Sequence, residues 1–126
     1  MSTKIRAAFE IAGWDEVPFD EGVAVAKLTR ASVKKTYTGD ITVTSATEWL
    51  MAYAPDKSAA FVGIERIKGT VAGKKGSLVL QHVGAFKDGA ATAALTVLSG
   101  TGALKGSEGT GMLVADPQGS ISLSLG

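Results

Sequence analysis

Glycine residues separate the apolar runs of this chain, and their spacing constrains the fold more than any other feature. The chain has 16 glycines but only three prolines. The glycines recur at intervals of about ten residues. Apolar runs of that length, bounded by turn residues, are typical of short antiparallel strands joined by hairpins. The spacing therefore predicts an all-β chain.

Eight strands fit between the turn residues. The predicted ranges are about 3–11, 23–37, 40–53, 59–71, 77–86, 90–98, 110–116 and 119–125. An acidic segment with one proline, residues 13–22, is predicted as a loop. Every connection can be short, so strands that are neighbours in the sequence can pair as an up-and-down meander. Eight such strands can close into an antiparallel β-barrel, whose interior holds side chains or one small ligand.

One segment also fits another structure. Residues 45–54 begin with a Ser-x-x-Glu pattern, Ser45 to Glu48, which is typical of a helix capping box. The residues before it, "DITVTSAT" (40–47), alternate β-branched residues with others and contain no break. We therefore predict a strand and keep the helix as the alternative.

Composition excludes several classes of site and partner. The chain has no cysteine and one histidine, which excludes disulfides, thiolate nucleophiles and zinc sites built on Cys or on several His ligands. The net charge is +1 and the signs are mixed along the chain, so we expect no nucleic-acid partner. No apolar segment has the length of a signal-peptide core or of a membrane span. We expect one cytoplasmic domain, residues 1–126, with no membrane partner.

The alternation of side chains along the strands indicates which residues line the interior. The fourth and fifth predicted strands place Glu65 and His82 on their bulkier faces, which we expect to point inward. The other candidates on inward faces are Trp49, Tyr53, Phe61 and Phe86. A slip of one residue in the phase would replace Glu65 by Arg66 and His82 by Gln81. Arg66 and Gln81 are therefore also candidate ligand-binding residues.

Glu65 and His82 are the candidate catalytic residues. A carboxylate inside an apolar barrel has its charged form disfavoured, which raises its pKa and suits it to general acid or base chemistry. The alternative is structural: Glu65 would pair with Arg66, Lys27 or Arg30 at a rim. His82 could likewise be a hydrogen-bonded histidine without a chemical role, and Trp49 and Tyr53 could simply pack in the core.

Three other patterns in the sequence do not match known phosphate-, dinucleotide- or calcium-binding motifs. The segment 69–75 lacks the glycine spacing of a phosphate loop, and Lys105 stands where the third glycine of a dinucleotide fingerprint would be. Four acidic residues lack the spacing of a calcium loop and are predicted to lie in a solvated loop. They are Asp15, Glu16, Asp20 and Glu21.

The glycine-dense segment carries a resemblance to known barrels. "LSGTGALKGSEGTG" (98–111) resembles the late hairpin of allene oxide cyclase-like barrels, and dirigent proteins carry a similar segment. The chain looks closer still to a bacterial family of unknown function, over roughly residues 3–125. The matching segments are "TEWLMAY" (47–53), "FVGIERIKGTVAGKKGSLVLQHVGAF" (61–86) and "SGTGALKGSEG" (99–109).

This resemblance implies an eight-stranded barrel that needs no cofactor and forms a homo-oligomer, a dimer or a trimer. The allene oxide cyclases and dirigent proteins steer the cyclisation or coupling of a reactive apolar substrate, whereas fold alone does not fix function. Three hypotheses remain. The first is a barrel that binds a small apolar molecule, the second is a cofactor-independent isomerase or cyclase acting on a fatty-acid- or polyketide-like substrate, and the third is a structural oligomer with a filled core.

Overall fold

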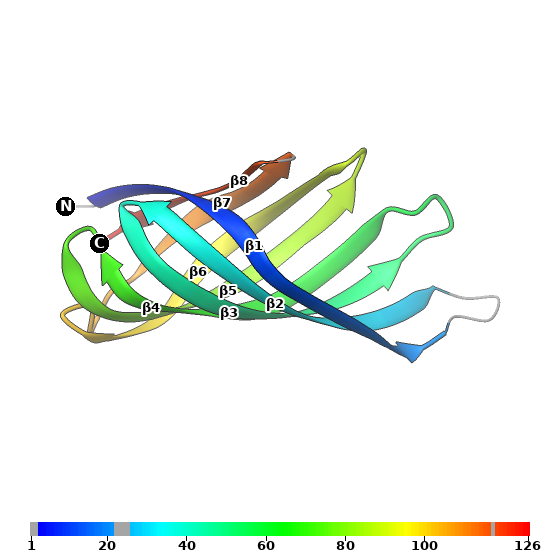
Figure 1. Ribbon diagram of the computed structural model, residues 1–126, viewed down its shortest axis with the longest axis horizontal. Helices are drawn as coiled ribbons and strands as arrows, with labels where there is room; N and C mark the ends of the chain where they lie inside the picture. The colour runs from blue at the N-terminus through cyan, green and yellow to red at the C-terminus, as the bar shows by residue number, and fades with distance from the viewer. Residues whose placement is uncertain (1–2, 22–25, 117) are drawn as a thin grey trace.

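The computed structural model describes residues 3–21, 26–116 and 118–126 and folds them into eight antiparallel strands. The strands are β1 (Thr3–Asp20), β2 (Lys27–Gly39), β3 (Ile41–Tyr53), β4 (Ala59–Val71), β5 (Lys74–Lys87), β6 (Ala90–Gly102), β7 (Gly109–Asp116) and β8 (Gln118–Leu125). Each strand pairs with the next in sequence, and β8 pairs back with β1, so the sheet forms a closed ring (Figure 1).

The predicted all-β antiparallel fold is confirmed. The segment 45–54, for which a helix was the alternative, lies in β3 as far as Tyr53. The predicted start of the second strand at 23–25 and Pro117 in the predicted last turn lie outside the described residues. No helix in the described part of the chain is long and apolar enough to cross a membrane.

The predicted loop at 13–22 is wrong over most of its length, because β1 continues to Asp20. Its pairing with β2 shifts register between Ile11 and Gly13, and again between Pro18 and Asp20. Such bulges insert one extra residue into a strand without ending it. They let an acidic segment with a glycine and a proline stay in the sheet.

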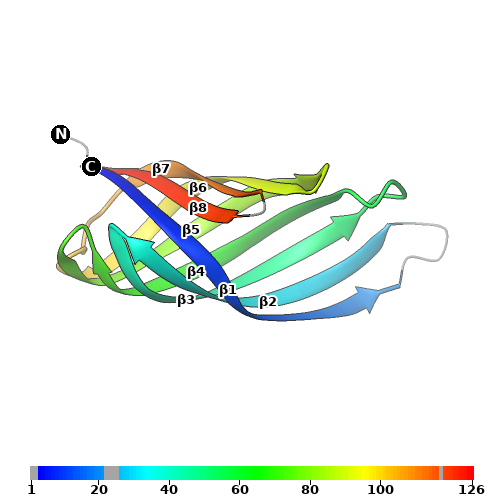
Figure 2. The same ribbon diagram turned by 45° about the horizontal axis from the view of Figure 1, so that its top comes forward.

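The strands differ in length, which gives the ring an extended end. β1 has 18 residues, whereas β7 and β8 have eight each. β8 pairs only with Thr3–Phe9 of β1, so among the eight described strands the second half of β1 has a neighbour on one side only. Both views show β1, β2, β3 and β4 running well past the end of β7 and the start of β8 (Figures 1 and 2). We call this the extended end.

The opposite end is filled by the connection between β6 and β7. Leu104 in this connection is buried and belongs to the core cluster. A Cβ on Gly100 would lie 2.1 Å from the carbonyl oxygen of Leu104, so only glycine lets the connection fold this closely over the ring. The glycine-dense segment therefore closes one end of the ring.

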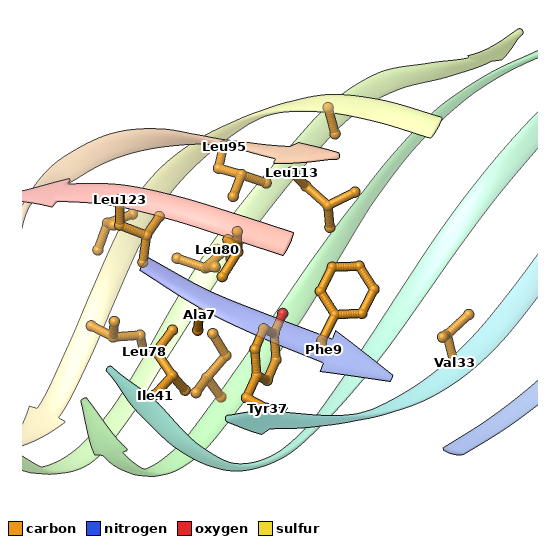
Figure 3. Packing of buried hydrophobic residues seen from close by; sticks show 14 of the residues in the cluster. Ala7, Phe9, Val33, Tyr37, Ile41, Leu78, Leu80, Leu95, Leu113 and Leu123 are labelled. Atoms are coloured by element: carbon orange, nitrogen blue, oxygen red, sulfur yellow. The ribbon is translucent and has the colours of Figure 1, made fainter. Parts of the chain in front are cut away.

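The core inside the ring is built from alternate residues of all eight strands. Figure 3 shows leucine side chains of β5, β6, β7 and β8 in the interior, together with Ala7, Phe9, Tyr37 and Ile41. The ring centroids of Phe9 and Tyr37 lie 5.6 Å apart. This apolar packing surrounds a polar cluster on β2, β3, β4 and β5.

Candidate functional site

A buried carboxylate, Glu65, is the centre of the polar cluster inside the ring. Its side chain is fully buried and lies within hydrogen-bond distance of four other side chains. Oε1 lies 2.8 Å from Nε2 of His82 and 3.3 Å from Nζ of Lys35. Oε2 accepts hydrogen bonds of 2.6 Å from the hydroxyls of Tyr37 and Ser45. These four donors come from β2, β3 and β5, so the network ties three strands to β4.

A glycine brings Trp49 and His82 together next to this carboxylate. Gly63 of β4 lies between Trp49 of β3 and His82 of β5 in the register of the sheet. A Cβ on Gly63 would lie 2.4 Å from the Trp49 ring. The indole therefore crosses the space of the missing side chain, and its Nε1 donates to Nδ1 of His82 at 3.2 Å.

The hydrogen-bond network assigns the proton on the His82 ring. The indole N–H can only donate, so Nδ1 of His82 accepts and the ring N–H lies on Nε2, pointing to Glu65. Both nitrogens of His82 are thus engaged in the interior. His82 is held as a link between Trp49 and Glu65.

The expectation of a raised pKa for Glu65 is wrong. Burial does raise the pKa of this carboxyl, but the hydrogen bond from His82, the charge of Lys35 and the hydrogen bond from Ser45 outweigh burial and lower the pKa to about 2. Glu65 is therefore an anion at neutral pH, with its oxygens engaged by four donors. This arrangement suits a fixed charge rather than a proton-transfer group.

Lys35 is the cation of this cluster. Its side chain is fully buried, and burial lowers the pKa of its ammonium while the Glu65 charge counteracts that effect. Nζ lies 4.8 Å from the centroid of the Phe9 ring and 5.0 Å from that of Trp49. Burial, followed by the charge of Glu65, raises the pKa of Tyr37 far above its usual value, so this hydroxyl remains a donor. The ion pair is thus enclosed by aromatic rings.

A second inward carboxylate, Glu16, lies towards the extended end. It accepts hydrogen bonds from Trp14 Nε1 at 3.1 Å and Thr29 Oγ1 at 2.6 Å, and a third from the Tyr53 hydroxyl. Burial tends to raise the pKa of Glu16, but these hydrogen bonds and the charge of Lys27 lower it below its usual value. The interpretation of Glu16 as part of a solvated loop is wrong, because the bulge after Ile11 turns it inward.

Trp14 connects the two carboxylate clusters. Its ring lies edge-on to that of Trp49, with 5.6 Å between the centroids. Trp49 is 5% exposed, whereas Trp14 is 47% exposed. Trp14 thus presents one side to solvent and the other to the interior. The exposed aromatic surface of the extended end begins at this ring.

The structure divides the predicted site residues into two groups. Six lie on the inner face, namely Glu65, His82, Trp49, Tyr53, Phe61 and Phe86. Phe61 packs against Trp49 with 4.9 Å between ring centroids, whereas Phe86 is 39% exposed. Arg66 and Gln81 are exposed on the outer face, so the alternative phase that would place them in the interior is wrong, and their role in ligand binding stays a prediction. The phase that places Glu65 and His82 inside also turns these two outward.

Sequence reasoning missed five polar or aromatic residues of the two clusters. They are Trp14, Glu16, Thr29, Lys35 and Tyr37. The alternation of β2 offered a signal, because Thr29, Lys35 and Tyr37 share one face of that strand. Lysine is rarely buried without a partner, so residue type argues against an inward position for Lys35 and hides this signal in the sequence.

One polar atom in the interior has no partner among the described residues. Thr47 is buried on the inner face, opposite Glu65 in the register, and its Oγ1 makes no hydrogen bond. Among residues 3–21, 26–116 and 118–126, no group of three or more His, Cys, Asp or Glu side chains could hold a metal ion.

Comparisons with known proteins give a family but no activity. A family model described as "Protein of unknown function (DUF3224)" matches residues 5–126. A crystal structure of a protein of unknown function from that family, from Shewanella oneidensis MR-1, is similar over 100% of this chain and 98% of its own, with 32% identity and a TM-score of 0.82. No curated protein matches the chain.

Proposed function

Because the chain belongs to the DUF3224 family of proteins of unknown function, we propose a role from its own site: it binds a small, largely apolar molecule at the extended end, against Trp14, Trp49 and Tyr53. The observation that carries this proposal is the half-exposed ring of Trp14, which lies over the buried ring of Trp49. Ligand sites are typically lined by aromatic rings with a few fixed polar groups.

The polar groups needed for orientation are already fixed in place. The carboxylate of Glu16 accepts hydrogen bonds from Trp14, Thr29 and Tyr53. The side chain of Tyr53 is only partly buried. Burial and the neighbouring Glu16 raise the pKa of Tyr53 to about 12, so its hydroxyl keeps its proton at neutral pH. A ligand that stacks on Trp14 would meet this hydroxyl and the Glu16 carboxylate beside it.

The chemistry of Glu65 favours binding over catalysis. An isomerase or cyclase with Glu65 as general base would need a carboxylate that can take up a proton near neutral pH. The lowered pKa of Glu65 and its four donors do not suit that role. Glu65 and His82 instead hold Trp49 in place, so we assign them a positioning role. The kinship with allene oxide cyclase-like barrels, the cytoplasmic location and the independence of cofactors stay predictions.

Native mass spectrometry of the protein purified from its own cell extract tests the proposal. We expect an excess mass that denaturation releases, and this mass would identify the ligand class. The ligand would then be titrated into the Trp14→Ala variant, with Val17→Ala as the matched control, because Val17 lies on the same strand and pairs with the outward Arg30.

We expect Trp14→Ala to weaken binding about tenfold or more, since an aromatic contact and its buried area are lost, and Val17→Ala to leave it unchanged. Equal affinities in both variants would contradict the proposed site. If no adduct appears, in the extract or after exposure to pools of fatty acids and aromatic metabolites, the filled structural barrel replaces this proposal.

A further inference from the structure

A groove on the outer face of β2, β3 and β4 lies outside the site described above. Its volume is about 520 Å³, and eight residues line it. Two of them, Lys35 and Ser45, point their side chains inward to Glu65. The other six are exposed, namely Ala12, Lys34, Thr44, Ala46, Arg66 and Lys68. Three of them are cations, one is a hydroxyl and two are alanines, so the groove is basic and has a small-residue floor.

The register of the sheet arranges the three cations around Ala46. Lys34 of β2 pairs with Ala46, and Ala46 pairs in turn with Arg66 of β4. Because neighbouring strands lie about 4.8 Å apart, the Cα atoms of Lys34 and Arg66 stand roughly 10 Å apart with only a methyl group between them. Lys68 pairs with Thr44, and these two residues lie two positions along their strands from Arg66 and Ala46, on the same face.

No carboxylate forms an ion pair with these three cations within the part of the chain that the structure describes. The ion pairs of that part join other residues, namely Arg30 with Glu48 and Lys35 with Glu65. Glu48, two residues along β3 from Ala46, is held by Arg30 at 2.7 Å and by Ser32. Like charges on neighbouring strands disfavour the fold, and an anion between them removes that repulsion.

The bulge in β1 leaves one side of the groove uncovered. Ala12 is the extra residue between Ile11 and Gly13 and has no partner in β2. β8 pairs only as far as Phe9 of β1, so none of the described strands lies beyond Ala12 on that side. A ligand can therefore reach the cations along the edge of the sheet as well as from above.

We propose that this groove binds a tetrahedral oxyanion, either free phosphate or the phosphate group of a small molecule. The guanidinium of Arg66 can bind two oxygens at once, Lys34 and Lys68 supply charge from both sides, and the Thr44 hydroxyl can donate to a further oxygen. The groove is separate from the aromatic site at the extended end, so this inference does not depend on the proposed function.

Nuclear magnetic resonance titrations of the full chain test the inference. Inorganic phosphate, phenyl phosphate and acetate would each be added at constant pH and ionic strength while the backbone amides are followed. We expect saturable shifts at Thr44, Ala46 and Arg66 with both phosphates and none with acetate. Tighter binding of phenyl phosphate would indicate a phosphorylated small molecule, whereas equal binding would indicate free phosphate.

Two double variants provide a comparison at equal net charge. Lys34→Gln with Arg66→Gln removes two groove cations, and Lys4→Gln with Lys87→Gln removes two exposed lysines elsewhere. We expect the groove variant to bind phosphate about tenfold more weakly or not at all, and the control to bind as the unmodified chain does. Equal weakening in both variants, shifts spread over the whole surface, or no saturable shift with either phosphate would overturn the inference.

Discussion

The carboxylate of Glu65 illustrates at the scale of one residue how neighbours decide the chemistry of a buried group. The sequence predicted its inward position but not its donors, which lie on β2, β3 and β5. A carboxyl group surrounded by apolar side chains becomes a weak acid, whereas one with several donors and a nearby cation becomes a fixed anion. Glu65 belongs to the second kind.

Removing the charge of Glu65 is expected to destabilise the fold. In Glu65→Gln the buried ammonium of Lys35 loses its carboxylate partner, and breaking a buried pair in this way costs about 3–5 kcal/mol of unfolding free energy. Urea denaturation measures this loss. The matched control is Glu48→Gln, which breaks the exposed pair with Arg30 and is expected to cost less than about 1 kcal/mol. Similar losses in both variants would contradict the role assigned to Glu65.

The lowered pKa of Glu65 also predicts how the free energy of unfolding depends on pH. The folded pKa of Glu65 is lowered from 4.5 to about 2, so the unfolded chain binds more protons between these values. The contribution of Glu65 is therefore complete above about pH 5 and is lost as the pH falls through 2, by about 3 kcal/mol in total. Urea denaturation at several pH values tests this. In Glu65→Gln that part of the pH dependence should disappear, and its persistence would show that other groups cause it.

The second half of β1 shows at the scale of an element why a strand was read as a loop. Gly13, Pro18 and the acidic residues around them are disfavoured in strands. Here they are tolerated because this part of β1 pairs on one side only, and an edge strand accommodates proline and charges. The bulges at Ile11/Gly13 and Pro18/Asp20 absorb the remaining mismatch.

The first bulge also determines which way Trp14 and Glu16 point, because one extra residue inverts the alternation. Because Ala12 is the unpaired residue, deleting it would let Ile11, Gly13 and Trp14 pair without a bulge with the same residues of β2, Lys35, Lys34 and Val33. Trp14 and Glu16 are therefore expected to stay on the inner face in this deletion variant. Near-ultraviolet circular dichroism reports the contact of Trp14 with Trp49, and the ligand titration reports the site. A deletion variant that is folded but has lost both signals would contradict the assignment of Ala12 as the extra residue.

The missing side chain of Gly63 is a second feature at this scale. In Gly63→Ala the added Cβ would lie 2.2 Å from the carbonyl oxygen of Glu48 and would displace Trp49. We expect a loss of about 1–3 kcal/mol of unfolding free energy from this overpacking. The control is Gly13→Ala, whose Cβ would lie 3.7 Å from its nearest neighbour, the Cβ of Lys34. Thermal unfolding of both variants distinguishes them, and equal stability would show that Trp49 can move without cost.

At the scale of the whole molecule, part of the outer surface is apolar, and this affects how copies of the chain can associate. Leu50, Val62 and Val83 pair across three neighbouring strands and are each about half exposed. Exposed apolar patches of this kind commonly mark contacts with another protein. The predicted homo-oligomer stays a prediction, and this face of β3, β4 and β5 is where we expect its interface.

A charge in the middle of this face tests that expectation. Val62→Glu is expected to convert the oligomer to a monomer, because it would bury an unpaired carboxylate between two copies. Thr92→Glu, an exposed change on β6, is the control. Sedimentation equilibrium measures the mass of each variant. If the unmodified chain is already a monomer at the concentrations used, the predicted oligomer is wrong.

The sequence by itself determined the antiparallel order of the strands, the inward faces of β3, β4 and β5, and the glycine-rich turns. These properties depend on neighbouring residues, because alternation and turn chemistry act within a few positions along the chain. The bounds of β4, 59–71, agree with the prediction to the residue. The bulge in β1 is also local, but no turn or apolar pattern marked it.

Only the tertiary structure decided the chemistry of the interior. Glu65 is an anion because donors from positions 35, 37, 45 and 82 converge on it, and Glu16 faces inward because one extra residue precedes it. Electrostatic and hydrogen-bond energies depend on distance in space rather than on separation in sequence. They take their final values only when the ring of strands brings these residues together.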